Sequence, residues 1–269
     1  MKLYFEWHRS CIKKGKRTEK LMRLKKAGFW PFFMTMILLA EPWNPSVILA
    51  QKPEPLSILQ LGTYRKLAPL NPFEVSDTFS TPLMQLVFNR LVRYDAQGQF
   101  EPDLAKDWKI SEDGKTYTFF LREGVRFHEG TECTAEDALY SLKLAADPVL
   151  SPSLSEPLKI IQEMKVISKF SLEIKLREPF APFLLSLWRV YIIPKKNLSN
   201  MPADLQNFLK NPIGTGPFIF SHQNASGIQL KTNLDYFEGQ PSLGGVDIRV
   251  YSDKDQMWSA EGPSFLIVS

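Results

Sequence analysis

The chain has 269 residues, of which 44% are hydrophobic and 23% charged, which indicates a globular protein and excludes a disordered one. Its formal charge of +4 invites a nucleic-acid-binding interpretation, but the charge is unevenly placed. Residues 1–28 carry ten Lys and Arg against two Glu, whereas residues 51–269 carry 23 basic against 26 acidic side chains. We therefore expect no nucleic-acid partner, because the body of the chain has no basic stripe for phosphates.

The first fifty residues have the pattern of an export leader. A basic segment is followed by "FWPFFMTMILLA", residues 29–40, which is shorter than the ~20 residues of a transmembrane helix. The segment "SVILA" then ends on the small residue Ala50. This order predicts a signal peptide over residues 1–50 and a periplasmic protein. A membrane anchor at residues 29–40 is the alternative, and both Met1 and Met22 fit as the start.

The body begins with a predicted strand and a predicted helix. The segment "LSILQLG", residues 56–62, alternates apolar residues and predicts a strand that runs into a loop. Thr81 and Pro82 predict the start of a helix, because proline fits the first helical turn. The apolar residues that follow recur at helical spacing. Turns are then expected at "DAQGQ" and "EDG".

The most strongly patterned stretch is "DGKTYTFFLREGVRFHEGTECTAED", residues 113–137. Residues 116–121 alternate and predict a strand with one apolar face. Thr134, with Asp137 three residues later, has the pattern of a helix N-cap. The helix is expected to stop at residues 147–148, an Asp-Pro pair.

The second half of the chain continues the mixture of strands and helices. "MKVISKFSLEIKLREPF" predicts two strands around a turn, and "PFLLSLW" predicts a short helix. "NPIGTGPFIF", residues 211–220, predicts a glycine-containing turn that enters a strand, and further strands are expected in "GIQLKTNLDYF" and "GGVDIRVYSD". The fold class is therefore predicted to be α/β.

The sequence offers no catalytic or metal-binding motif. His8, His128 and His222 are scattered without metal-ligand spacing, and His128 is expected at a turn or on the surface. "GTGPF" lacks the third glycine of a dinucleotide fingerprint, and no P-loop or G-x-S-x-G occurs. After removal of the leader only Cys133 remains, which excludes an internal disulfide. We expect no enzyme, no cofactor and no metal site.

Four segments together resemble a known family over residues 56–251. They are "LVRYDAQGQFEPDLAKDWKISEDGKTYTFFLREGVRFHEGTECTAEDALYSLK", "LEIKLREPFAPFL", "NPIGTGPFIF" and "NLDYFEGQPSLGGVDIRV", in this order. The chain resembles the family 5 extracellular solute-binding proteins, the dipeptide, oligopeptide and nickel receptors of ABC importers. Cys133 departs from the family's usual apolar residue, and a small buried thiol is the expected role.

The resemblance implies a type II periplasmic-binding-protein-like clamshell that closes on a solute between two lobes. It assigns residues 51–72 and 190–259 to part of the first lobe. Residues 73–189 resemble the family's extra small α+β domain. Residues 260–269 leave the family pattern, so we expect the second lobe to be missing through truncation or a frameshift.

The resemblance also suggests where a solute binds. The loop after the first strand is expected to line the cleft, with Thr63, Tyr64 and Arg65 touching the solute. Tyr64 would stack or donate a hydrogen bond, and Arg65 would hold a carboxylate through two hydrogen bonds. Thr215 and Gly216 are the second choice. An ordinary solvated loop is the alternative for all five.

The implied function is the solute-binding component of an ABC importer, with peptide as the favoured solute and the permease subunits as partners. Nickel chelates, haem and sugars stay open, because the sequence does not separate them. The alternative function is a non-transport remnant, or a scaffold without a ligand.

Overall fold

The computed structural model describes residues 57–74, 80–198, 200, 203–260 and 265–266. The predicted leader, its cleavage point and the alternative anchor lie outside the described residues, as do residues 261–264 and 267–269 of the predicted tail. No helix within these described ranges has the length and apolar character needed to cross a membrane.

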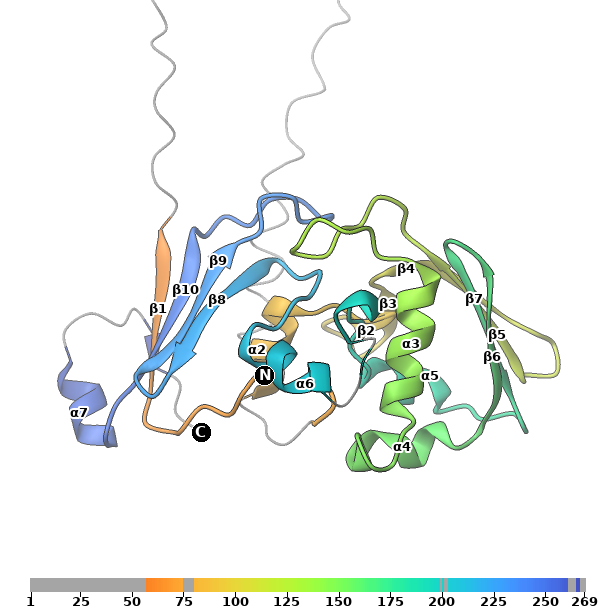
Figure 1. Ribbon diagram of the computed structural model, residues 1–269, viewed down its shortest axis with the longest axis horizontal. Helices are drawn as coiled ribbons and strands as arrows, with labels where there is room; N and C mark the ends of the chain where they lie inside the picture. Colours follow the sequence, from red (N-terminus) through yellow and green to blue (C-terminus); the bar gives the residue numbers. More distant parts are fainter. Residues whose placement is uncertain (1–56, 75–79, 199, 201–202, 261–264, 267–269) are drawn as a thin grey trace, which may run out of the picture.

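Two structural units lie side by side along the longest axis of the molecule (Figure 1). We call residues 91–190 the small unit and the remaining described residues the sheet unit. Each has its own cluster of buried apolar side chains. The clusters change over between Phe88 and Leu91, so Phe73 and the helix that follows it pack with the sheet unit. The boundary at residue 73 that the sequence suggests stays a prediction.

The sheet unit is built on a five-stranded sheet of order β11-β1-β10-β9-β8. Strand β1 pairs in parallel with β10 and β11, whereas β9 runs antiparallel to both β10 and β8. The strands are β1 Ile58–Thr63, β8 Phe218–Asn224, β9 Gly227–Thr232, β10 Gly245–Val250 and β11 Phe265–Leu266.

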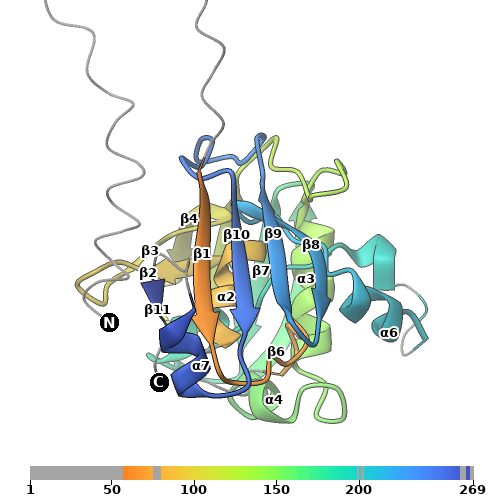
Figure 2. The ribbon, with the colours of Figure 1, turned by 90° about the vertical axis from the view of Figure 1, so that its left-hand side faces the viewer.

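The pairing brings the ends of three strands to one edge. Because β9 is antiparallel to both of its neighbours, β8 runs in the same direction as β10 and β1. The chain enters β1 at the top of Figure 1 and leaves it at the bottom, on the way to the next helix. We call the end of the sheet where β1, β10 and β8 finish the carboxyl edge. Figure 2 shows this edge below the sheet, next to α7 (Lys254–Ser259).

One face of this sheet is apolar and the other polar. Helix α2 (Ser80–Val87) contacts β8 on the face turned toward the small unit. Alternate residues of β8, β9 and β10 are buried there: Phe218, Phe220, Ile228, Leu230, Val246 and Ile248. Gln229, Lys231 and Arg249 are exposed on the other face, as the two-residue period of a strand requires. The unit also contains a 3-10 turn, Lys195–Leu198, and α6, Ala203–Lys210.

The small unit is a four-stranded antiparallel sheet of order β4-β5-β7-β6, with helices on one face. Helix α3 contacts β6 and β7, and in Figure 1 it lies between this sheet and the sheet unit. The strands are β4 Ala105–Ile110, β5 Thr116–Leu121, β6 Ile161–Ser168 and β7 Ser171–Leu176. The helices are α3 Ala135–Ala145, α4 Pro152–Leu158 and α5 Phe183–Trp188, and a short hairpin joins β2 Val92–Tyr94 to β3 Phe100–Pro102.

The local patterns of residues 113–137 are confirmed. Strand β5 buries every second residue, with Phe119 fully enclosed. Helix α3 begins after Thr134, whose backbone N–H donates to the Asp137 carboxylate at 2.9 Å. Cys133 is a free and buried thiol, as expected.

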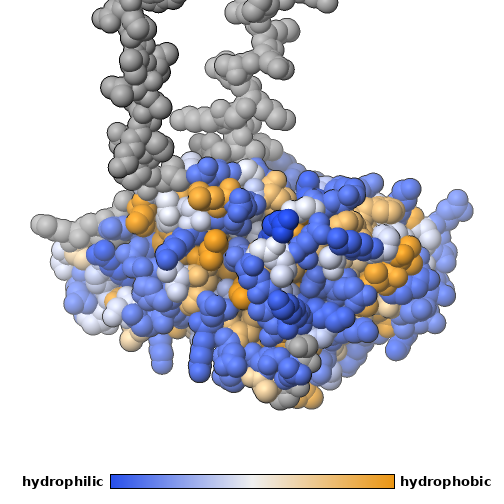
Figure 3. All heavy atoms as spheres, turned by 45° about the horizontal axis from the view of Figure 1, so that its top comes forward, coloured by the Kyte–Doolittle hydropathy of each residue, from blue (hydrophilic) through white to orange (hydrophobic). Residues whose placement is uncertain are grey.

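The surface seen obliquely from above the view of Figure 1 is mainly hydrophilic. Figure 3 shows broad hydrophilic areas interrupted by separate hydrophobic patches. The view is tilted so that the end of the molecule opposite the carboxyl edge comes forward.

Candidate functional site

The loop that leaves β1 at the carboxyl edge is held by its own backbone. Thr63 is 1% exposed, and its side-chain oxygen accepts the N–H of Arg65 at 3.1 Å. The N–H of Tyr251, just after β10, donates to the Thr63 carbonyl at 2.8 Å. The side chain of Thr63 therefore fixes the loop, whereas Tyr64 is half-buried and Arg65 is exposed.

The rest of this loop is fastened to the sheet unit. The Gln223 side-chain amide donates to the carbonyls of Leu67 at 3.3 Å and Ala68 at 3.0 Å. Leu70 and Phe73 are buried in the core of the unit. The loop is consequently a formed part of the carboxyl edge, with Tyr64 and Arg65 near its start.

A second segment meets the loop at the same edge. Asp253 begins α7 and accepts the Gln256 N–H at 2.7 Å, while the Ser252 hydroxyl donates to the other carboxylate oxygen at 2.7 Å. These hydrogen bonds, the first of them foremost, lower the pKa of Asp253. Trp258, farther along α7, is 55% exposed. In open α/β sheets, ligands bind beyond the carboxyl ends of the strands, which makes this edge the candidate surface for a solute.

Gly214, Thr215 and Gly216 form a turn before β8, at the opposite end of the sheet. We call these three residues the glycine turn. The N–H of Gly216 donates to the Val87 carbonyl at 2.9 Å. A Cβ added to Gly216 would lie 2.5 Å from the Val87 carbonyl carbon, and one added to Gly214 would lie 2.0 Å from the Val87 oxygen. Only glycine lets the last turn of α2 sit this close.

Thr215 belongs to a buried hydrogen-bond network rather than to an open surface. It is 1% exposed, and its hydroxyl donates to the Asn89 side-chain oxygen at 3.0 Å. Asn89 in turn donates to one carboxylate oxygen of Asp103 at 2.8 Å, and the backbone N–H of Arg90 donates to the other at 2.8 Å. Because Asp103 lies in the small unit, the network joins the two units.

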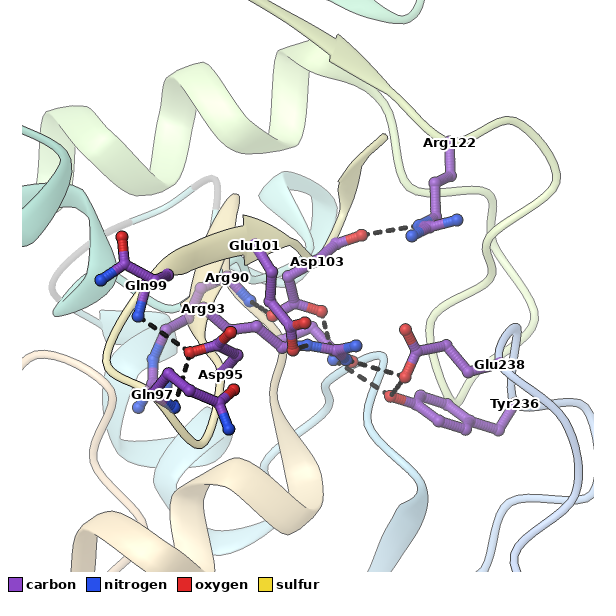
Figure 4. Close-up of polar contacts among 11 residues, drawn as sticks. Arg90, Arg93, Asp95, Gln97, Gln99, Glu101, Asp103, Arg122, Tyr236 and Glu238 are labelled. Carbon is purple, nitrogen blue, oxygen red and sulfur yellow. Dashed lines mark hydrogen bonds and ion pairs between the residues drawn. The ribbon is translucent and has the colours of Figure 1, made fainter. Parts of the chain in front are cut away.

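An ion-pair cluster extends this network. Arg93 of β2 contacts Glu101 of β3 and Glu238 of the sheet unit, each at 2.8 Å. The Tyr236 hydroxyl donates to Glu238 at 3.3 Å (Figure 4). It accepts from the Asn89 side chain at 3.3 Å. We call the set Asn89, Arg93, Asp103, Thr215, Tyr236 and Glu238 the polar junction.

Burial governs the electrostatics of the polar junction. It raises the pKa of Asp103 to about 6, although Arg93 and the hydrogen bond from the Arg90 backbone act in the opposite direction. Burial also raises the pKa of Tyr236. The guanidinium carbon of Arg90 lies 4.8 Å from the centre of the Trp188 ring and 4.4 Å from the centre of the Tyr191 ring. These groups are arranged to hold two units together, and nothing in their geometry resembles a nucleophile beside a base.

His128 adds a third connection between the units. The residue lies in a turn, as the sequence suggests, but it is half-buried. Its Nε2 lies 3.0 Å from the Gly216 carbonyl, and its Nδ1 accepts the Gly214 N–H at 3.3 Å. Burial lowers the pKa of His128 to about 4. Sequence reasoning missed this role, because its partners lie 86 and 88 positions away.

The structure does not bring the five predicted site residues together. Thr63, Tyr64 and Arg65 lie at the carboxyl edge, whereas Thr215 and Gly216 lie before β8, about six residues of strand away, which is roughly 20 Å. Solute binding by any of the five stays a prediction.

Across the described ranges, no three His, Cys, Asp or Glu side chains gather as a metal site. The Cys133 thiol has a raised pKa through burial.

A family model for bacterial extracellular solute-binding proteins, family 5 (middle), matches residues 99–261, more than half of the chain. The chain belongs to family 5 of the bacterial extracellular solute-binding proteins. Curated relatives of this family 5 chain include the nickel-binding periplasmic protein of Escherichia coli K12, 31% identical over 195 residues, and the oligopeptide-binding protein AppA of Bacillus subtilis, 28% identical over 210 residues. These matches cover 70% and 76% of this chain but 36% and 39% of the relatives.

Solved family 5 structures have the same fold. NikZ from Campylobacter jejuni, in complex with Ni(L-His), aligns with a TM-score of 0.67 and 28% identity over 74% of this chain and 40% of its own. AppA from Bacillus subtilis, in complex with a nonapeptide, aligns with a TM-score of 0.66 and 28% identity over 74% of this chain and 41% of its own. The predicted α/β fold, part of a type II clamshell, is confirmed. The chain spans about two fifths of the length of these relatives.

Proposed function

We propose that this chain provides one wall of an exported solute receptor, with the solute contacting the carboxyl edge of the sheet unit. The observation that carries the proposal is the loop after β1, which is fastened by Thr63 and Gln223 but leaves Tyr64 half-buried and Arg65 exposed. An ordered backbone that presents polar and aromatic side chains at the surface lowers the entropy lost on binding. The family supports a solute-binding role rather than catalysis.

The favoured solute is a peptide. The Arg65 guanidinium suits a carboxylate, which it binds through two parallel hydrogen bonds, and the Tyr64 ring suits a side chain or a peptide plane. The nonapeptide complex of AppA supports this choice, while the Ni(L-His) complex of NikZ keeps a chelated metal as the competing solute class. Delivery to the permease subunits of an ABC importer, after export to the periplasm, completes the proposed role.

Ligand-detected NMR on the full chain tests the site, with an equimolar mixture of di- to pentapeptides as the probe. Arg65→Ala should weaken binding about tenfold, since a charge-assisted hydrogen bond contributes about 1.5–3 kcal/mol. The matched control is Lys231→Ala, which removes an exposed cation from the polar face of the sheet.

Equal weakening by both variants would contradict a specific site at the carboxyl edge. An unchanged affinity in Arg65→Ala would remove Arg65 from it. Absence of binding to any peptide in the mixture would favour the ligand-free scaffold instead.

A further inference from the structure

His128 makes three hydrogen bonds to the glycine turn, and all three cross between the units. Its backbone N–H donates to the Gly214 carbonyl at 2.9 Å. Its Nε2 lies 3.0 Å from the Gly216 carbonyl, and its Nδ1 lies 3.3 Å from the Gly214 nitrogen. The same turn supports the end of α2 through the bond from Gly216 to Val87.

The two ring contacts define one protonation state. A carbonyl oxygen only accepts, so Nε2 must carry a hydrogen toward Gly216. A backbone N–H only donates, so Nδ1 must offer its lone pair to Gly214. The neutral imidazole protonated on Nε2 satisfies both contacts. In the imidazolium both nitrogens are donors, and the Nδ1–H would then face the Gly214 N–H.

No charged side chain among the described residues around the ring offsets this conflict. Arg126, on the same turn, donates to the Gly130 carbonyl. Glu129 accepts from Thr131 and from Asn197. The facing segment, residues 211–217, contains no titratable side chain, and Val87 and Phe88, which lie against Gly214, are apolar.

We propose that His128 is a positioning residue that fixes the small unit against the glycine turn and α2 only in its neutral form, and that its protonation releases this contact. The inference stands whichever solute the chain binds, because it concerns the contact between the two units. The low pKa, about 4, keeps the contact closed at neutral and mildly acidic pH and places its release in the acidic range.

Histidine-selective ¹⁵N labelling of the full chain tests the tautomer directly, since the sequence has three histidines. Spectra of His128→Gln and His222→Gln assign the signals. At pH 7 the His128 imidazole should be neutral with its hydrogen on Nε2, and it should become cationic only near pH 4. A hydrogen on Nδ1, or a cationic ring at pH 6, would overturn the proposal.

Hydrogen exchange of peptides covering residues 84–90 and 211–217 tests the release, with rates corrected for the intrinsic effect of pH. In the wild type, protection of these segments should fall about tenfold between pH 5.5 and pH 4, the effect of losing one or two hydrogen bonds. Residues 171–176 of β7, inside the small unit, are the internal reference.

Two substitutions separate the positioning role from a structural one. The amide of His128→Gln supplies one acceptor and one donor but gains no charge, so it should retain protection at pH 5.5 and lose the acid response. His128→Phe removes both ring contacts and should lower protection at each pH. An acid response in His128→Gln equal to that of the wild type would show that another group controls the contact.

Discussion

The carboxyl edge and the glycine turn lie at opposite ends of the same sheet and use their polar groups in opposite ways. At the glycine turn, Thr215 is 1% exposed and its hydroxyl is bonded to Asn89. At the carboxyl edge, Thr63 is equally buried, yet its neighbours Tyr64 and Arg65 are half-buried and exposed, respectively, on a fastened loop. The comparison teaches that a glycine-rich polar segment can connect two units, while the proposed solute surface is at the other end of the sheet.

The difference originates in how closely the backbones approach. At the glycine turn, the last turn of α2 leaves no space for a side chain on Gly214 or Gly216. A solute could reach this turn only by displacing α2, which is part of the core of the sheet unit. We therefore expect substitutions there to alter stability, and substitutions at the carboxyl edge to alter binding.

The largest expected effect comes from Gly216→Ala. The new Cβ would collide with the backbone of α2, at 2.5 Å from the Val87 carbonyl carbon and 2.6 Å from the Leu86 oxygen. Because backbone atoms are displaced, the free energy of unfolding should fall by about 3 kcal/mol or more, measured by urea denaturation.

The control for this substitution is Gly98→Ala. Gly98 has a φ of +76° but has no atom within 4 Å of an added Cβ, so the loss should be about 1 kcal/mol. If the two variants lost the same free energy, close approach to α2 would not be the reason for glycine at position 216.

The pH dependence of stability should reveal the charged groups of the junction. Asp103 has a native pKa of about 6 against an ordinary value of 3.8, so the native state binds more protons between these values. Its contribution to the free energy of unfolding therefore falls as the pH rises from about 4 to 6. The native pKa of His128 is about 4 against an ordinary value of 6.5, so the unfolded state binds more protons between these values. The contribution of His128 to the free energy of unfolding therefore rises with pH in this range.

Asp103→Asn removes the contribution of Asp103 to the pH dependence of the free energy of unfolding. From pH 4 to 6, the free energy of unfolding of the variant should rise by about 2 kcal/mol relative to the wild type, because most of the two-unit difference in pKa is titrated in this range. His128→Gln should change in the opposite direction over the same range. Parallel curves for Asp103→Asn and the wild type would exclude a raised pKa for Asp103.

Much of the fold was predictable, because its signals are local. The alternation in β5 and the Thr134 cap of α3 each lie within a few positions of sequence. Strand β4 was missed because its burial does not alternate, and α4 because it contains Pro157. The polar junction was not predictable, since its contacts join residues such as Asn89 and Thr215, 126 positions apart.

Arg93→Lys should have a moderate effect. The Arg93 guanidinium contacts Glu101 and Glu238 at once, whereas an ammonium cannot reproduce this fork. We expect a loss of about 1–2 kcal/mol in the free energy of unfolding, because the cluster is partly buried. Lys159→Arg, in an exposed ion pair with Glu156, is the reference and should stay within about 0.5 kcal/mol of the wild type.

The central claim is that the side chains of the glycine turn stabilise the fold, whereas the exposed side chains of the carboxyl edge do not. Urea denaturation of Thr215→Val and Arg65→Ala, side by side on the full chain, measures it most directly. Thr215→Val should lose about 1–3 kcal/mol, because it leaves the buried Asn89 oxygen without its donor. Arg65→Ala should remain within about 0.5 kcal/mol of the wild type, as for an exposed side chain. A stable Thr215→Val beside a destabilised Arg65→Ala would contradict the account.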